Sequence, residues 1–125
     1  MIQVAQIGIG YWGPNLLRNR VANKQCRVKR VIDKAGDRRD YVKNLYHGIL
    51  VSEGIQDIVE DPAITAVVIA TPVKTHYDLA TALLGAGQHV LVEKPMTTTL
   101  AQIEDLQSLA KSRNLVAMAG HTFLY

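Results

Sequence analysis

Short apolar runs alternate along the chain with longer stretches in which apolar residues recur every three or four positions. The short runs predict strands, and the most continuous of them, 66–70 and 89–92, are typical of strands buried on both faces of a sheet. The longer stretches predict helices with one apolar face. Strands are expected at 2–7, 26–33, 48–51, 66–70, 89–92 and 115–118, and helices from 14 to 23 and after residues 37, 52, 75 and 99.

Polar residues mark three of the expected helix starts. Asp37, Thr75 and Thr99 are each followed three positions later by an acid or an amide, which is the spacing of a capping box. The helix after Thr99 is expected to turn one apolar face toward the sheet. That face consists of Leu100, Ile103, Leu106 and Ala110.

The strands and helices alternate in strict order with short connections, and this order predicts the fold class. We expect an α/β fold of the Rossmann type, with a doubly wound, mostly parallel sheet and helices on both faces. The expected strand order is 3-2-1-4-5-6. No repeat, low-complexity segment or linker divides the chain, so residues 1–125 are predicted to form one domain.

Composition narrows the class of protein further. The chain of 125 residues is 48% hydrophobic and 20% charged, with a net charge of +3, as in ordinary globular proteins. Its basic residues are dispersed and its aromatic content is only 6%, so neither a nucleic-acid partner nor a membrane is expected. The single cysteine, Cys26, excludes an internal disulfide, and the start of the chain lacks a signal-peptide pattern. We expect a cytoplasmic protein without a metal site.

A glycine motif lies between the first strand and the first helix. Gly8, Gly10 and Gly13 have the spacing G-x-G-x-x-G, in which the first glycine permits a tight turn and the second lets the backbone approach a pyrophosphate. The third lets the helix pack closely on its strand, and the helix N-terminus faces the phosphates. Taken alone, the motif is equally consistent with an ordinary glycine turn.

Asp33 strengthens the nucleotide interpretation. It lies 20 positions after Gly13 (33 − 13 = 20), at the end of the second expected strand, where a dinucleotide-binding fold places an acid against the adenosine ribose 2′-hydroxyl. A carboxylate there repels a 2′-phosphate and favours NAD, although Lys34, Arg38 and Arg39 soften that preference. The alternative is that Asp33 only begins a turn.

The ends of the later strands supply further candidates, because ligands of such sheets bind beyond the carboxyl ends of the strands. Thr71 and Pro72 are placed to line the ribose and pyrophosphate, and His76 either points toward the nicotinamide or is a surface histidine of a helix. Glu93 can accept a hydrogen bond from a ribose hydroxyl, and Lys94 can exchange a proton with a substrate hydroxyl. The alternative for these two is a polar turn with an ion pair. The expected crevice combines Ala70, Thr71, Pro72, Glu93, Lys94 and His121.

Three segments together resemble one protein family: the loop from Gly8 to Gly13, Ala70-Thr-Pro72 with His76, and Glu93-Lys-Pro95. They are similar to the nucleotide-binding half of the Gfo/Idh/MocA oxidoreductases. The resemblance implies NAD(P)-dependent oxidation of a sugar or polyol hydroxyl, with Lys94 as the catalytic lysine and Glu93 at the cofactor ribose. It also assigns the loop residues Tyr11 and Trp12 to the cofactor.

The segments 10–19 and 120–125 resemble family members that oxidise the 3-hydroxyl of nucleotide-linked amino-sugar acids. We therefore expect a sugar or nucleotide-linked sugar as substrate and NAD as cofactor.

One departure from the family is large. Members continue into a second domain, which supplies the substrate contacts, most of the homo-oligomer interface and a further Asp/His pair, and none of it is present in these 125 residues. We expect this chain alone to be inactive. Many members have Asn where this chain has His121. A different class also remains open, namely a stand-alone dinucleotide-binding sensor or interaction domain without catalysis.

Overall fold

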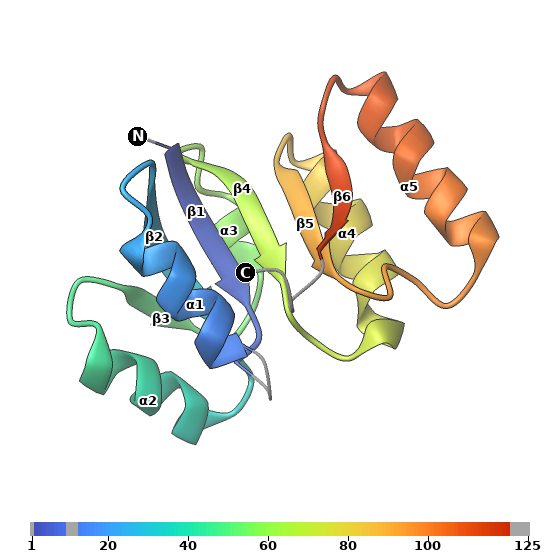
Figure 1. Ribbon diagram of the computed structural model, residues 1–125. Coiled ribbons are helices and arrows are strands. Elements are labelled where there is room, and N and C mark those ends of the chain that lie inside the picture. The colour runs from blue at the N-terminus through green and yellow to red at the C-terminus, as the bar shows by residue number, and fades with distance from the viewer. Residues whose placement is uncertain (1, 10–12, 121–125) are drawn as a thin grey trace.

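The computed structural model describes residues 2–9 and 13–120. Six strands form one sheet in the order β3-β2-β1-β4-β5-β6, and every pairing is parallel (Figure 1). The predicted fold class and strand order are confirmed. The strands are β1 (Ile2–Ile7), β2 (Cys26–Ile32), β3 (Leu50–Ser52), β4 (Ile64–Ile69), β5 (His89–Glu93) and β6 (Ala117–Gly120).

Helices cover both faces of the sheet. Figure 1 shows α1 and α2 on the near side of the sheet, over its β1–β3 half, and α3 and α4 behind it. No helix within the described ranges is both long and apolar enough to cross a membrane. The helices are α1 (Gly13–Ala22), α2 (Gly36–Leu45), α3 (Gln56–Val59), α4 (His76–Gly85) and α5 (Leu100–Ser112), and a 3₁₀ turn at Val73–Thr75 precedes α4.

Alternating side chains of β1 enter two separate parts of the core, because successive residues of a strand point to opposite faces. Val4 packs with Leu17 of α1 and Val42 of α2. Ala5 and Ile7 belong to the larger cluster, which α3, α4 and α5 build on the other face. The sheet is therefore buried on both sides around β1 and β4, as the continuous apolar runs predict.

The position of the site follows from this winding. The chain leaves β1 toward β2 and β3, whereas it leaves β4 toward β5 and β6. β1 and β4 lie side by side, with Ile7 opposite Ile69. The connections from these two strands diverge, and a crevice opens between them at their carboxyl ends.

The expected helix starts are only partly correct. Thr99 accepts a hydrogen bond from the backbone N–H of Gln102 at 3.2 Å, so this cap is confirmed. Asp37 does not cap α2, which begins one residue earlier, at Gly36. Thr75 occupies the N-cap position of α4, but its hydroxyl donates to the Pro72 carbonyl instead of accepting from the helix.

The prediction that Leu100 lies on the inner face of α5 is wrong, because the residue is 70% exposed. Helical side chains lean toward the helix N-terminus, so the side chain of the first residue projects beyond the turn that packs on the sheet. Leu106 and Ala110 are buried as expected.

The contrast between two leucines of α5 gives a stability prediction. Leu106 is fully buried, so Leu106→Ala should lower the free energy of unfolding by about 2–5 kcal/mol. Leu100→Ala is the matched control and should change it by no more than about 0.5 kcal/mol. Urea denaturation followed by circular dichroism measures both, and equal losses would contradict the packing described for α5.

Candidate functional site

A cavity of 540 Å³ opens at the carboxyl ends of β1, β2 and β4. The last residues of β1 and β2, Ile7 and Ile32, contribute to its lining. The loops that follow these three strands, the loop after β3 and Leu79 of α4 contribute as well. The lining residues from these loops include Gly8, Asp33, Glu53, Ala70, Thr71 and Pro72. The cavity therefore brings together residues that the sequence separates by more than sixty positions.

Gly8 is the point where two of these loops meet. Its φ is +95°, in the region that side chains disfavour. A Cβ at this position would lie 2.5 Å from the Ala70 carbonyl oxygen and 2.8 Å from Cγ2 of Thr71. Only glycine fits there. Gly13 is the first residue of α1, and the predicted loop residues Gly10, Tyr11 and Trp12 lie outside the described part of the chain.

Asp33 follows β2 and holds the start of the glycine loop. Its Oδ2 accepts from the backbone N–H of Ile9 at 2.8 Å, and its Oδ1 accepts from the N–H of Ala35 at 2.9 Å. The guanidinium of Arg39 donates to the Asp33 carbonyl oxygen at 2.8 Å. No pattern in the sequence indicates the bond to Ile9, which spans 24 positions, whereas the bond to Ala35 is the local turn that the alternative for Asp33 describes. Each carboxylate oxygen retains a lone pair for another donor.

The opposite wall of the cavity is the loop after β4. The hydroxyls of Thr71 and Thr75 lie 2.6 Å apart, and Thr75 also donates through its hydroxyl and its N–H to the Pro72 carbonyl, at 2.6 and 2.9 Å. Ala70 is buried, and its N–H donates to Ile7 at 2.8 Å, which continues the β1–β4 ladder into the loop. This wall is held by short-range bonds and is fixed relative to β1.

Glu93 is the last residue of β5, and Lys94 follows it. Neither residue lines the 540 Å³ cavity, so the expectation that they share one crevice with the loop after β4 stays a prediction. Burial raises the pKa of the Glu93 carboxyl, and the charge of His76 offsets part of that effect. Lys94 is exposed, and its N–H donates to the Gly120 carbonyl at 3.2 Å. The ion pairs among the described residues are Lys29–Asp61 and Arg30–Asp57, so the alternative of a Glu93–Lys94 surface ion pair is not observed.

His76 is 2% exposed, so the alternative of a surface histidine is wrong. Its ring lies between the loop after β4 and the loop after β5, with both nitrogens near backbone carbonyl oxygens. A direct contact with a nicotinamide stays a prediction. His121, the last of the predicted crevice residues, lies outside the described part of the chain.

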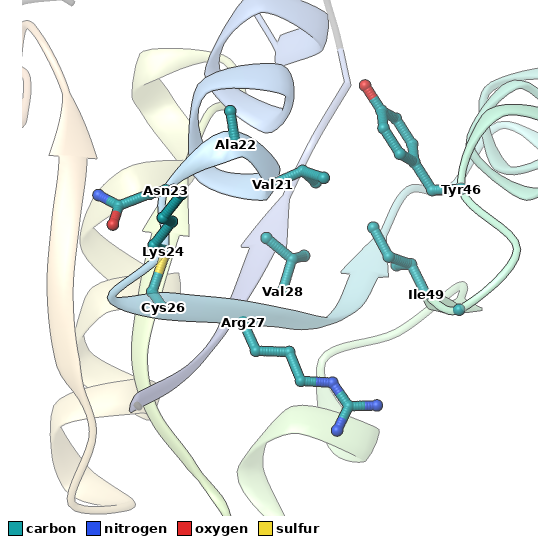
Figure 2. A pocket seen from close by; sticks show the side chains of 10 residues that line it. Val21, Ala22, Asn23, Lys24, Cys26, Arg27, Val28, Tyr46 and Ile49 are labelled. Carbon is teal, nitrogen blue, oxygen red and sulfur yellow. The ribbon is translucent and has the colours of Figure 1, made fainter.

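A second hollow, with a volume of 460 Å³, lies at the amino-terminal end of β2, away from the carboxyl ends of the strands (Figure 2). Figure 2 shows the side chains of Val21, Val28 and Ile49 turned toward one another, beside the ring of Tyr46. The lining of this hollow includes no carboxylate and none of the predicted site residues. Parallel sheets bind ligands at the carboxyl ends of their strands, so the 540 Å³ cavity is the candidate site. Within residues 2–9 and 13–120, no cluster of His, Cys, Asp and Glu side chains is arranged to hold a metal ion.

Comparison with known proteins agrees with this geometry. A family model described as an oxidoreductase family with an NAD-binding Rossmann fold matches residues 2–121. The oxidoreductase YdgJ of Escherichia coli, itself uncharacterised, is 36% identical over 120 residues, which are 96% of this chain and 34% of that protein. A dTDP-3,4-didehydro-2,6-dideoxy-α-D-glucose 3-reductase of Streptomyces antibioticus is 43% identical over 72 residues, 58% of this chain and 22% of the relative.

Two solved structures show the same similarity. GenD2 from gentamicin A biosynthesis, crystallised with NAD, has a TM-score of 0.90 at 27% identity. The match covers 95% of this chain and 34% of the GenD2 chain. A mutant of KijD10, a 3-ketoreductase from Actinomadura kijaniata, was crystallised with TDP-benzene and NADP. It has a TM-score of 0.89 at 31% identity over 98% of this chain and 38% of its own. The chain thus spans about a third of the length of such proteins.

The close approach at Gly8 predicts a specific loss. Gly8→Ala places a methyl group against the Ala70 carbonyl at a positive φ, and the backbone strain alone should cost about 1–3 kcal/mol of unfolding free energy. Gly54→Ala is the matched control in the same cavity wall, because a Cβ there meets nothing within 4 Å. Denaturation curves of the two variants test this prediction. A Gly8→Ala protein with an unchanged free energy of unfolding would contradict the described approach of the loops.

The raised pKa of Glu93 predicts a pH dependence of stability. The folded protein binds this proton more tightly than the unfolded chain does, so the associated stability is present below pH 4.5 and is lost as the pH rises through the folded-state pKa. Glu93→Gln removes the titrating group. The variant should therefore gain stability relative to the parent protein between pH 4.5 and neutrality. The free energy of unfolding of both proteins, measured against pH, tests this, and two parallel profiles would contradict the raised pKa of Glu93.

Proposed function

Because the chain belongs to the Gfo/Idh/MocA oxidoreductase family, as an NAD-binding Rossmann domain, we propose that it is the cofactor-binding part of an enzyme that transfers a hydride between a sugar hydroxyl and NAD. The observation that carries this proposal is the single cavity in which the Gly8 turn, the Asp33 carboxylate and the loop after β4 meet. The three features belong to three different strand ends, and together they suit one elongated, phosphate-bearing ligand.

The residues fit the adenosine half of such a cofactor. Asp33 has acceptor capacity beyond its two backbone bonds, and we assign it to the ribose hydroxyls. Gly8 has no side chain that would occupy the space beside the ligand. The start of α1 offers backbone N–H groups to the pyrophosphate. We assign Gly10, Tyr11, Trp12 and Gly13 to the same role. Ala70, Thr71 and Pro72 form the facing wall.

The strand end at Glu93 fits the nicotinamide half. We assign the half-buried Glu93 carboxyl to the second ribose as a hydrogen-bond acceptor, and His121 to this end as well. Lys94 is exposed and is the residue that holds or accepts the proton of the sugar hydroxyl. When bound, the cofactor accepts the hydride. The chain positions and polarises the reactants.

The substrate class rests on the relatives. One is a reductase of a dTDP-linked 3-keto sugar, and a 3-ketoreductase was crystallised with a TDP derivative. We propose a sugar, nucleotide-linked or free, as the substrate of the intact protein, whose remaining part supplies the substrate contacts and a homo-oligomer interface. The chain spans about a third of the relatives' length, so that part is expected to lie outside these residues.

The proposal predicts binding without turnover for this chain. NADH should bind, because the residues assigned to the adenosine half are present. Sugar oxidation should be undetectable, because positioning a substrate accounts for roughly 7–11 kcal/mol of a barrier and exposed Lys94 lacks the desolvation that makes a lysine a base near neutral pH. NADH fluorescence titration and an NAD-reduction assay with free and nucleotide-linked sugars measure the two quantities.

Lys94→Met is the control for the two readouts. It should leave NADH affinity within about threefold, since the cofactor is held mainly by hydrogen bonds from other residues. No NADH binding by the parent chain would refute the proposal. Turnover at an ordinary rate, roughly 1–10³ per second, would show that these residues already hold the substrate.

Asp33 predicts a preference for NAD(H) over NADP(H). The charged hydrogen bond to the ribose should contribute about 1.5–3 kcal/mol, and the carboxylate repels a 2′-phosphate. Asp33→Asn keeps an oxygen for the Ile9 N–H but removes the charge, so the preference should shrink about tenfold or more. Lys34→Gln is the control for the neighbouring charge and should lower NADP(H) affinity. Equal affinities of the parent chain for both cofactors would exclude this role of Asp33.

A further inference from the structure

His76 forms a bridge between two loops that the sequence separates. It is the first residue of α4 and is 2% exposed. Its Nε2 lies 2.7 Å from the Thr71 carbonyl oxygen, in the loop after β4. Its Nδ1 lies 3.0 Å from the carbonyl oxygens of Pro95 and Met96, in the loop after β5. One buried ring therefore contacts both loops.

The ring is the hydrogen-bond partner that the described residues offer these carbonyls, since none of them has a backbone donor there. Met96 is buried and Thr71 partly buried, whereas Pro95 is exposed, and a buried carbonyl without a donor is costly. A neutral imidazole has a single N–H and could serve only one of the two loops. With acceptors at both nitrogens, the ring satisfies both loops only when both nitrogens carry protons.

A charged ring needs a balancing group nearby. Glu93, at the end of β5, interacts electrostatically with His76 in the direction that favours the carboxylate. The charged residues close in sequence to the contacts, Lys74, Asp78 and Lys94, are exposed, and the hydroxyl of Tyr77 is bonded to Asp105. Glu93 is thus the partly buried charge on the side of β5 that complements the ring.

We propose that His76 is a positioning residue, which as a doubly protonated ring joins the loop after β4 to the loop after β5 and thereby sets the place of Lys94 against the Thr71–Pro72 wall. Lys94 is held on both sides. Its backbone N–H donates to the carbonyl of Gly120, and the backbone carbonyls of the next two residues are bonded to the ring of His76. The consequence for catalysis rests on the proposed function, whereas the joining of the loops does not.

The two nitrogens can be replaced separately. In His76→Asn the new side-chain amide lies near the place of Nδ1 and can donate to Pro95 and Met96 but not to Thr71. In His76→Gln the longer side-chain amide lies near the place of Nε2 and can donate to Thr71 but not to the loop after β5. This pair of variants has matched polarity, and each member is the control for the other.

Hydrogen exchange of two amides reports on the two loops in the cofactor-free chain. The Lys94 N–H is bonded to Gly120 and the Thr75 N–H to Pro72. In His76→Gln the exchange of Lys94 should rise about tenfold while that of Thr75 stays unchanged, because only the contact to the loop after β5 is lost. In His76→Asn the pattern should reverse. Equal changes at both amides in both variants, or no change, would overturn the proposal. A histidine with a merely structural role would not make the two variants affect opposite amides.

The parent chain supplies an independent test that requires no variant. The ¹⁵N chemical shifts of the His76 ring at neutral pH should place both nitrogens in the protonated range, and one unprotonated nitrogen would overturn the doubly protonated bridge. NADH titration of the same samples separates the two proposals. A chain that shows the exchange pattern but binds no NADH retains the bridge and loses the proposed function, whereas the opposite result retains the function and removes the bridge.

Discussion

The close approach of two backbone segments at Gly8 is the constraint on which the rest of the site depends. β1 and β4 are neighbours in the sheet, yet the chain leaves them in opposite directions, so the loops after them must pass each other at the carboxyl edge. With the Ala70 carbonyl 2.5 Å from where a Cβ would lie, they pass in contact. This contact forms the floor of the crevice and fixes the distance between its two walls.

Several residues of this edge hold the loops in place and are also the ones proposed to contact the ligand. Asp33 holds the N–H of Ile9, and the same carboxylate is the acceptor proposed for the ribose. His76 holds the carbonyls of two loops, and one of these loops carries Lys94. Glu93 is half-buried although burial opposes its charge. Such an arrangement keeps the acceptors in place before a ligand arrives, which lowers the ordering cost of binding.

The elements and their order can be predicted from the sequence because both depend on local patterns. Apolar runs and helical spacing identify the strands and helices, and strict alternation leads to the sheet order that the structure confirms. The same reasoning locates Asp33 and Glu93 at strand ends. The burial of His76 and the bond of Asp33 to the N–H of Ile9 cannot be predicted, because they depend on how loops that are far apart in the sequence meet in space. The exposure of Leu100 escapes prediction because periodicity does not show where the sheet stops supporting a helix.

The measurement that tests the central claim most directly is ¹⁵N–¹H chemical-shift mapping of this chain during titration with NADH. We expect the perturbed amides to gather at the carboxyl edge of the sheet, at 8–9, 33–35, 70–76 and 93–97, while the amides around the hollow of Figure 2, such as those of Val28 and Ile49, stay unchanged. Perturbations centred on that hollow, or absent at saturating NADH, would contradict the assignment of the cofactor site to this edge.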